Sequence, residues 1–315
     1  MVTGMSKDWV RVILNPTAGQ GRARGKLGEI ERALARHEGR SEILVTHGPG
    51  HAAELARAAH AEGVTVIAVV GGDGTLNEVV QAYVGADGQP RPGPDLALIP
   101  CGTGGDWRRT LGIHTDVSIA VARAVSGKVR EIDLGVAQFE PHAGQSPVRA
   151  FINVASFGLS GAVDAVVKRV PQVLGGKGAF FVATLQAMAR FTNPSVRVRV
   201  DGAPWLEGPS MTVAIGNGKY FGGGMMIAPD ADPSDGKLSV VSLGDLSKTA
   251  AVALTGKIYS GTHVHARGVT VTSGTRIEAE PMHAWATVLL DIDGEQPGKL
   301  PMVATVHRAA LKFRV

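Results

Sequence analysis

The sequence predicts an α/β domain with a parallel sheet, followed by a β-rich, sandwich-like domain. Strand and helix patterns alternate strictly over residues 1–134, which is typical of a parallel sheet with helices on both faces. Short β segments separated by frequent turns fill most of the remaining sequence, which is typical of an antiparallel sheet or a sandwich. With 315 residues the chain is long enough for two domains, because single hydrophobic cores stop growing near ~250–300 residues.

The composition is that of a globular protein with an ordinary charged surface. Hydrophobic residues make up 44% of the chain and charged residues 19%, and the Lys and Arg behind the net charge of +4 are scattered along the sequence. Without a basic cluster, a solvated surface is favoured over nucleic-acid binding. The single cysteine, Cys101, excludes an intramolecular disulfide and a thiolate metal cluster, and it suits a reducing compartment.

No segment of the sequence has the pattern of a membrane-spanning helix. The N-terminus lacks an apolar signal core. The longest apolar helical stretch, residues 178–189, contains a Gln and falls short of the ~20 residues that span a bilayer. We therefore expect a cytoplasmic protein that at most touches the inner face of the membrane.

Each element of the first domain, residues 1–134, follows from an apolar pattern. Buried strands are short runs of largely β-branched residues, and helices have apolar residues three or four positions apart. The expected strands are residues 10–14, 42–46, 64–70, 96–99 and 129–134. The expected helices begin at residue 26, span residues 52–62, begin at residue 76 and begin near residue 116.

The second domain, residues 135–315, is expected to be rich in strands. The polar, turn-rich stretch 135–147 is interpreted as a hinge, and a strand at 149–155 and helices near 160–170 and 178–191 follow it. Short strands are then expected at residues 195–200, 211–216, 238–243, 269–272, 276–280 and 286–292. The basic, alternating segment 303–315 is compatible with a strand that returns to the first domain.

Three glycine-rich loops, at residues 15–21, 71–75 and 102–105, each follow an expected strand. Because parallel strands end at one edge of the sheet, where such sheets bind ligands, all three loops are expected to open there. The loop at 71–75 leads into a helix, so its glycines leave backbone N–H groups open to an anion. Asp73 and Thr75 add the carboxylate and hydroxyl that a phosphate-transfer site needs. Taken alone, this loop is equally compatible with a phosphate cradle and with a plain turn.

Two acidic stretches in the second domain are candidates for chemistry. Three carboxylates lie in six residues of the loop 230–238, which suits a hard cation such as Mg²⁺, although an acidic turn before a strand is the commoner structure. Asp291 and Asp293 end an apolar strand, and Glu295 follows a Gly turn. A carboxylate at such a strand end suits a general base, and a hairpin with solvated acids is the alternative.

Five motifs, in their order along the chain, resemble those of the diacylglycerol-kinase-like lipid kinase family. This family includes bacterial diacylglycerol kinases and sphingosine and ceramide kinases. The motifs are Asn15-Pro16 with Gly19, Gly71-Gly72-Asp73-Gly74-Thr75 with Asn77-Glu78, Pro100 with Gly102-Thr103 and Asp106, Asp235-Gly236-Lys237-Leu238, and Asp293-Gly294-Glu295. They span nearly the whole chain. The glycine-rich motif alone is less specific, because NAD kinases and phosphofructokinases carry similar loops.

The resemblance implies an ATP-binding α/β domain like that of NAD kinase and phosphofructokinase, a β-rich domain, and a lipid site by the cleft between them. It implies that ATP contacts Asn15, Thr46, Gly71, Gly72, Asp73, Gly74, Thr75, Asn77 and Thr103. It also implies a structural Mg²⁺ held by Asp232, Asp235 and the carbonyl of Lys237. Glu295, with Asp293 beside it, matches the family's proton acceptor, whereas Asp73 matches the residue with that role in the sphingosine branch.

The activity that the resemblance implies is ATP-dependent phosphorylation of a hydroxyl of a diacylglycerol-like or sphingoid lipid. The implied partners are a lipid alcohol and a nucleotide, and a homodimer and a transient membrane contact stay open. The family's third motif usually reads Gly-Thr-x-Asn-Asp-Phe, and here Gly105 and Trp107 replace the Asn and the Phe. A nucleotide- or lipid-binding regulator with weakened catalysis is therefore one alternative, and an NAD-kinase-like small-molecule kinase is another.

Overall fold

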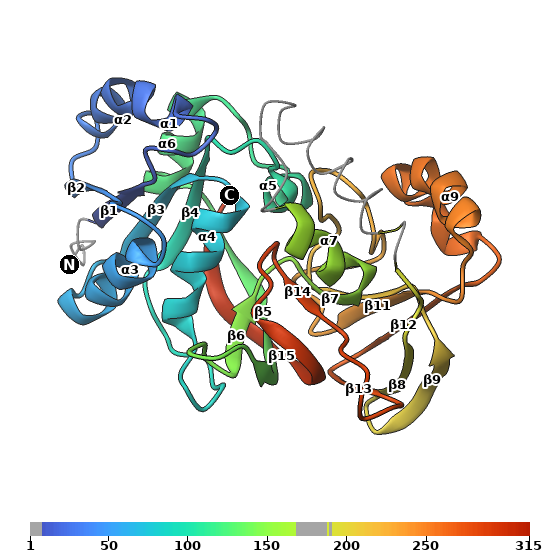
Figure 1. Cartoon of the computed structure of the whole chain (residues 1–315). Helices are drawn as coiled ribbons and strands as arrows, with labels where there is room; N and C mark the ends of the chain where they lie inside the picture. Colours follow the sequence, from blue (N-terminus) through green and yellow to red (C-terminus); the bar gives the residue numbers. More distant parts are fainter. Residues whose placement is uncertain (1–7, 168–187, 189–190) are drawn as a thin grey trace. The chain divides into compact units, whose positions relative to one another are not determined.

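The chain, described by a computed structural model for residues 8–167, 188 and 191–315, folds into two compact units. Unit 1 comprises Met1–Gly85, Pro90–Ile132 and Ala309–Val315, and unit 2 comprises Ala86–Gln89 and Asp133–Arg308. Figure 1 shows the elements of both units, coloured along the sequence.

Unit 1 is built on a parallel sheet, as the alternation of strands and helices predicts. Its strands β1 (Trp9–Leu14), β2 (Arg40–Val45), β3 (Val66–Gly71) and β4 (Asp95–Pro100) have the spatial order β2-β1-β3-β4. Every pairing among them is parallel. The final residues of β15 (Gly298–Arg314) pair with β4, also in parallel.

Helices cover both faces of this sheet. They are α1 (Arg22–Gly25), α2 (Leu27–Leu34), α3 (His51–Glu62), α4 (Asp73–Val80), η1 (Gln81–Tyr83), α5 (Asp106–Leu111) and α6 (Val117–Ser126). Alternate strand residues, such as Val12 and Ala68, share a core with α2 and α6. Helices α3 and α4 pack together and contact β1 and β3 (Figure 1). Strand β3 is consequently buried along its whole length.

The turn between β3 and α4 is shorter than the sequence pattern predicts. Helix α4 begins at Asp73, so residues 73–75 form its first turn, and only Gly72, in an extended conformation, joins the strand to the helix. The expectation that the helix begins at residue 76 was therefore wrong by three residues. Apolar spacing marks the buried face of a helix, and a first turn of Asp-Gly-Thr carries no apolar residue to mark it.

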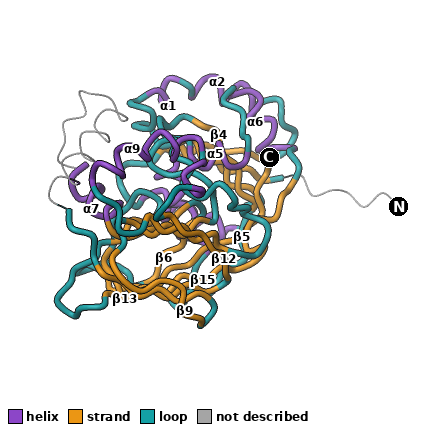
Figure 2. Tube along the Cα trace, turned by 90° about the vertical axis from the view of Figure 1, so that its right-hand side faces the viewer, coloured by secondary structure: helices purple, strands orange, loops and turns teal. Residues whose placement is uncertain are grey.

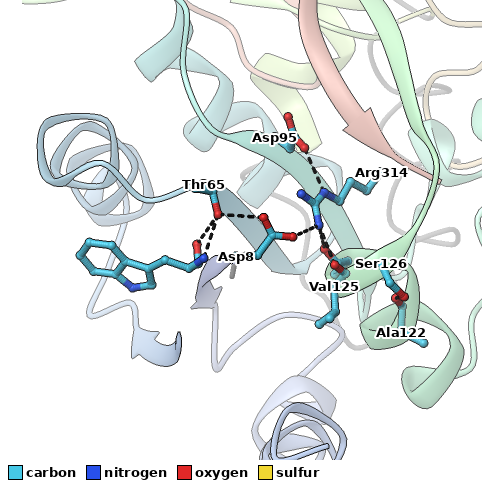
Figure 3. A network of polar contacts seen from close by, with 9 residues as sticks. Asp8, Thr65, Asp95, Ala122, Val125, Ser126 and Arg314 are labelled. Carbon is cyan, nitrogen blue, oxygen red and sulfur yellow. Dashed lines mark hydrogen bonds and ion pairs between the residues drawn. The ribbon is translucent and has the colours of Figure 1, made fainter. Parts of the chain in front are cut away.

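Arg314 fastens the end of β15 within unit 1 (Figure 3). Its guanidinium donates to the carboxylates of Asp8, at 2.8 Å, and Asp95, at 3.0 Å. The same side chain donates to the carbonyl oxygens of Ala124 and Val125 at the end of α6. The neighbouring Phe313 is fully buried and opposite Leu96 of β4.

Unit 2 is rich in β-structure, which confirms the fold class expected for the second domain. Its strands include most of β5 (Val129–Pro141) and β15, together with β6 (Val148–Phe151), β7 (Val154–Gly158), β8 (Ser195–Val200), β9 (Ala203–Pro209), β10 (Thr212–Gly216), β11 (Leu238–Leu243), β12 (Val269–Gly274), β13 (Arg276–Pro281) and β14 (Leu290–Ile292). One antiparallel sheet has the order β12-β11-β10-β7-β14. A second contains β15-β13-β8-β9 and the β5–β6 pair.

The two sheets of unit 2 enclose a common hydrophobic core. Phe157 and Ile215 from the first sheet share this core with Val198 and Met302 from the second. The opposite face of the first sheet packs against α7 (Leu159–Val167) and α9 (Lys248–Ser260), which precedes η3 (Thr262–His265). Figure 2 shows these helices against the strand layer. Among the described residues, no helix has the length and apolar character needed to cross a membrane.

Several expectations for unit 2 were wrong in detail. Residues 135–147 are not a hinge throughout, because β5 continues to Pro141; its polar Gln138 and Glu140 are the exposed positions of an alternating strand. The strand expected at 149–155 is two strands, β6 and β7, and the one expected at 286–292 is only β14. Strand β9 and helix α9 were not expected at all.

The two helices expected between residues 160 and 191 have different outcomes. Helix α7 confirms the start of the first. The second, at 178–191, lies outside the described residues apart from Met188 and Phe191.

Candidate active site

The three glycine-rich loops meet at the carboxyl end of the parallel sheet, which confirms the predicted common edge. The Asn15 side chain donates to Thr75 Oγ1 at 2.9 Å, which joins the first loop to the second. A Cβ atom on Gly102 would lie 2.5 Å from the Cα of Gly72, so the second and third loops touch through their backbones. A Cβ on Gly19 would lie only 2.0 Å from the carbonyl oxygen of Cys101. Close backbone approach therefore requires glycine here.

The first turn of α4 presents backbone donors at this edge. The N–H groups of Asp73, Gly74 and Thr75 stand at the first three positions of the helix, where no preceding helical carbonyl exists to accept them. A Cβ on Gly74 would meet nothing within 4 Å. This combination suits an anion, because the donors and the helix dipole both favour negative charge.

A cavity of about 110 Å³ lies beside this turn. The ends of β3 and β4, residues 102–105, and the side chains of Arg108, Arg109 and Thr115 line it. Among the expected ATP-binding residues, Gly71, Gly72, Asp73 and Thr103 line the cavity, whereas Asn15, Thr46, Gly74, Thr75 and Asn77 do not. The cavity is therefore lined by glycines together with two arginines.

Asp73 links the glycine turn to the third loop. Its Oδ2 accepts from the backbone N–H of Asp106 at 3.1 Å and its Oδ1 from that of Trp107 at 3.0 Å. The buried Asp106 carboxylate pairs in turn with Arg109 at 2.9 Å, and Arg109 also donates to the Gly104 carbonyl. Both oxygens of Asp73 thus hold the start of α5.

Three of the expected nucleotide contacts, Thr46, Thr75 and Asn77, are buried and do not line the cavity. Thr46, which follows β2, is 7% exposed, and its N–H donates to the Leu14 carbonyl. Asn77 is 1% exposed on α4, where Gln81 donates to its backbone and side-chain oxygens. Their polar side chains are enclosed near the edge of the sheet.

Cys101 follows β4 at this edge and is half-buried. Burial raises the pKa of its thiol above the ordinary value of 9.0. The thiol therefore stays protonated at neutral pH, and it offers no thiolate for nucleophilic chemistry.

In unit 2, Asp293 fastens the hairpin that carries Glu295. One oxygen of Asp293 accepts from the N–H of Ile152 at 3.0 Å, and the other accepts from Asn153 at 3.1 Å and Val154 at 2.9 Å. Ile292 and Glu295 exchange backbone hydrogen bonds at the tip. Asp293 itself has a φ of +50°, a conformation that the three bonds stabilise.

The acidic loop of unit 2 is held in shape by its own carboxylates. Asp232 accepts from the Ser234 N–H and Asp235 from the Lys237 N–H. The expected metal ligands of this loop are carboxylate and carbonyl oxygens, the type that Mg²⁺ prefers. Within the described residues, no group of three or more His, Cys, Asp or Glu side chains is arranged to hold a metal ion.

Asp133 is a residue that the sequence patterns did not single out. It is 1% exposed, its carboxylate accepts from the Gly236 N–H at 2.6 Å, and its own N–H donates to the Pro233 carbonyl. It therefore anchors the acidic loop from β5. An Asp inside an otherwise apolar run, Ile132-Asp133-Leu134, was the available signal.

Comparison with known families accounts for nearly the whole chain. The family model described as the diacylglycerol kinase catalytic domain matches residues 9–137, and the YegS C-terminal NAD kinase beta sandwich-like domain matches residues 153–315. The diacylglycerol kinase of Mycobacterium tuberculosis is 30% identical over 274 residues, which cover 86% of this chain and 84% of that protein. This chain belongs to the diacylglycerol-kinase-like lipid kinase family.

Solved structures confirm the fold. A crystal structure of a diacylglycerol kinase from Bacillus anthracis has a TM-score of 0.75 at 25% identity and covers 98% of this chain and 96% of its own. An Archaeoglobus fulgidus NAD kinase shares the fold, with a TM-score of 0.53 at 15% identity over 98% of this chain and 93% of that one. As a member of the lipid kinase family, the protein is assigned to the phosphotransferases.

Proposed function

We propose that this lipid kinase transfers the γ-phosphate of ATP to a hydroxyl of a diacylglycerol-like or sphingoid lipid. Residues 1–134 would form the nucleotide-binding domain and residues 135–315 the substrate domain. The proposal that this protein binds a nucleotide rests on one observation: three glycine-rich loops meet beside the first turn of α4. Backbone donors, a helix N-terminus and arginines around one cavity suit a polyphosphate.

The nucleotide contacts fall into two groups in this proposal. Gly71, Gly72, Asp73 and Thr103 border the cavity, and the first-turn N–H groups of Gly74 and Thr75 face the same edge. Asn15, Thr46 and Asn77 would hold the loops in place from behind, as the bond from Asn15 to Thr75 illustrates. The phosphates would then bind mostly to backbone N–H groups.

Glu295 is our choice for the proton acceptor. Asp73 and Asp293, the other two candidates, each bind two or three backbone N–H groups and hold a loop in shape, so we assign them positioning roles. Glu295 lies at the hairpin tip that Asp293 fastens. A carboxylate at a rigid tip is well placed to accept a proton from a substrate hydroxyl.

The reaction is an in-line displacement at phosphorus. The lipid hydroxyl oxygen forms a bond to the γ-phosphorus, the bond from that phosphorus to the bridging oxygen breaks, and ADP leaves. The hydroxyl proton passes to the carboxylate of Glu295. Positioning and charge neutralisation are expected to supply most of the rate enhancement, as in other phosphoryl transfers.

Mg²⁺ is expected in two roles. With ATP it would neutralise phosphate charge. In the acidic loop, Asp232, Asp235 and the Lys237 carbonyl would hold a second ion, and water would complete the shell, because these three ligands are fewer than Mg²⁺ requires. Thermal unfolding with and without MgCl₂ tests the loop: the shift should vanish in Asp235→Ala and persist in Asp230→Ala, whose exposed side chain is not assigned to the ion.

Activity is tested by phosphate transfer from γ-labelled ATP to diacylglycerol, sphingosine and ceramide in mixed micelles. Glu295→Gln is expected to lower kcat by roughly 10²–10⁴-fold, the usual contribution of a general base. Asp73→Asn and Asp293→Asn keep the shape of the side chain and weaken its hydrogen bonds, so smaller losses are expected. Unchanged turnover in Glu295→Gln would refute the assignment of Glu295 as the proton acceptor.

The same assay distinguishes the two alternative functions. Phosphorylation of NAD without lipid turnover would identify a small-molecule kinase of the kind whose fold this protein shares. Tight ATP binding without turnover on any lipid would identify a regulator with weakened catalysis. Gly105, where the family pattern has the amide side chain of Asn, is the reason to consider this alternative. We also propose a transient membrane contact, which vesicle sedimentation tests, and a homodimer, which light scattering tests.

A further inference from the structure

The third glycine-rich loop differs from its family pattern at Gly105, and the side chain of Arg108 lies over this glycine. Gly105 has a φ of +68° and precedes helix α5. A Cβ atom built on it would lie 3.1 Å from Nε of Arg108 and 3.8 Å from Nη2. The Arg108 side chain therefore folds back over Gly105 and occupies the space that a side chain at position 105 would enter.

The two arginines of α5 that line the cavity have different environments. Arg109 is neutralised by the Asp106 carboxylate at 2.9 Å and also donates to the Gly104 carbonyl. Arg108 has no carboxylate within ion-pair distance among the described residues, and its one hydrogen bond there, to the Ile113 carbonyl, is 3.5 Å long. A guanidinium carries five N–H donors, so most of the donors of Arg108 remain available to a ligand.

A guanidinium beside the glycine turn, with no carboxylate partner among the described residues, suits a phosphate group as its ligand. The cavity of about 110 Å³ brings Arg108 together with Gly71, Gly72 and Thr103, the part of the site where phosphate groups are expected. Arginine binds phosphate oxygens through two parallel N–H donors, and a half-buried position strengthens that bond.

We propose that Arg108 is a phosphate-binding residue of this protein, which takes the place of the side-chain amide absent at Gly105. The proposal rests on the proposed use of ATP and adds to it a contact specific to this chain. Arg108 in its present position crowds a side chain at position 105, because a Cβ atom there would lie 3.1 Å from its Nε and Arg108 would have to shift. A left-handed backbone tolerates Asn better than most residues, so the alternative can be built by mutation.

Calorimetric titration with ATP in the presence of Mg²⁺ tests the proposal, with adenosine as the probe that lacks phosphates. Arg108→Ala and Arg108→Gln are each expected to weaken ATP binding about tenfold or more and to leave adenosine binding unchanged. Arg108→Lys should recover part of the loss. The double variant Gly105→Asn with Arg108→Ala should bind ATP more tightly than Arg108→Ala alone. Arg57→Ala, an exposed arginine of α3 outside the cavity, is the matched control.

The outcomes separate the inference from the proposed function. If the wild type binds ATP and both Arg108→Ala and Arg108→Gln bind it as tightly, the role of Arg108 is refuted and the kinase proposal stands. Equal losses for ATP and adenosine would assign Arg108 a structural role and refute the inference. A wild type that binds no ATP would overturn the proposed function and the inference with it. If Arg108→Ala fails to fold, Arg108→Gln decides.

Discussion

At the scale of single residues, two aspartates of the kinase motifs serve as anchors for backbone. Asp73 binds the N–H groups that open α5, and Asp293 binds three consecutive N–H groups between β6 and β7. A buried or half-buried backbone N–H left without an acceptor costs about 1–3 kcal/mol. Such residues therefore stabilise the loops that they hold, whether or not they take a proton.

Asp293→Ala is expected to lower the free energy of unfolding by roughly 2–3 kcal/mol, because three backbone N–H groups lose their acceptor. Urea denaturation measures this change. Glu207→Ala is the control: it removes an exposed ion pair with Arg197 and should cost less than about 1 kcal/mol. Equal effects of the two substitutions would contradict the anchoring role.

His60 is expected to make stability sensitive to acid. Burial lowers its pKa below 6.5, and its ring packs edge-on against Tyr83. As the pH falls below 6.5, the unfolded chain binds a proton that the folded protein resists, so stability decreases. The stability is unaffected by this group above that pH, where both states are neutral.

His60→Leu removes the titrating group and a ring nitrogen, Nε2, that has no hydrogen-bond partner in the part of the chain that the structure describes. Urea denaturation at pH 8 and pH 5.5 should show a smaller loss of stability in the variant than in the wild type. His263 and His307, whose pKa values are also lowered by burial, remain in both proteins, so their effects cancel in the comparison. Parallel losses in the two proteins would mean that His60 does not titrate differently on unfolding.

At the scale of elements, unit 1 depends on the fit between its loops and on the strand that completes its sheet. The β3–α4 turn and the loop after β4 approach so closely that glycine backbones touch. The last residues of β15 enter the same unit beside β4 and are held by Arg314 (Figure 3). Each contact joins segments that are distant in sequence.

Gly102→Ala and Gly74→Ala are expected to change stability in opposite directions. At Gly102 the added carbon meets the Gly72 backbone at 2.5 Å, which cannot move cheaply, so a loss of roughly 1–3 kcal/mol is expected. At Gly74 the added carbon lies in open space within α4, where Ala is preferred by up to about 1 kcal/mol. Thermal unfolding compares the two, and a stable Gly102→Ala protein would show that the loops are further apart than described.

Arg314→Ala is expected to lower the free energy of unfolding by roughly 3 kcal/mol or more, because it leaves the Asp8 and Asp95 carboxylates without their cation. Lys312→Ala, an exposed position on the same strand, should stay within about 0.5 kcal/mol of the wild type. Urea denaturation measures both. Similar small effects would mean that the network contributes little to holding β15.

At the scale of the whole molecule, the proposed nucleotide binding and the proposed proton transfer belong to residues of different units. The proposed phosphate contacts lie in unit 1, whereas the proposed proton acceptor, Glu295, lies in unit 2. Binding of ATP to the folded protein stabilises it by mass action, independently of any later proton transfer.

ATP at about 100 times its Kd is expected to stabilise the protein by about 2.7 kcal/mol. Glu295→Gln should keep this stabilisation while turnover falls, since Glu295 acts on the lipid hydroxyl. Thermal unfolding with and without ATP, run beside the kinase assay, measures both quantities. Loss of the ATP-dependent shift in Glu295→Gln would mean that this residue holds the nucleotide.

The sequence by itself determined the two-part fold and the common edge of the three glycine-rich loops. Both are written in neighbouring residues: alternation and apolar spacing fix the elements, and parallel geometry places every loop after a strand at the same edge. The tertiary structure decided the roles of the side chains. Asp293 binds an N–H group 141 positions away, and Asp73 reaches across to α5.

The same division explains the features that the sequence pattern missed. The anchoring of the acidic loop by Asp133 and the position of Arg108 over Gly105 both depend on contacts in the folded chain. The return of the last strand to the first domain was expected as one option, and the pairing of β15 with β4 confirms it. Local periodicity carries no information about the contacts of Asp133 and Arg108, because their energy comes from pairing and burial between segments that only folding brings together.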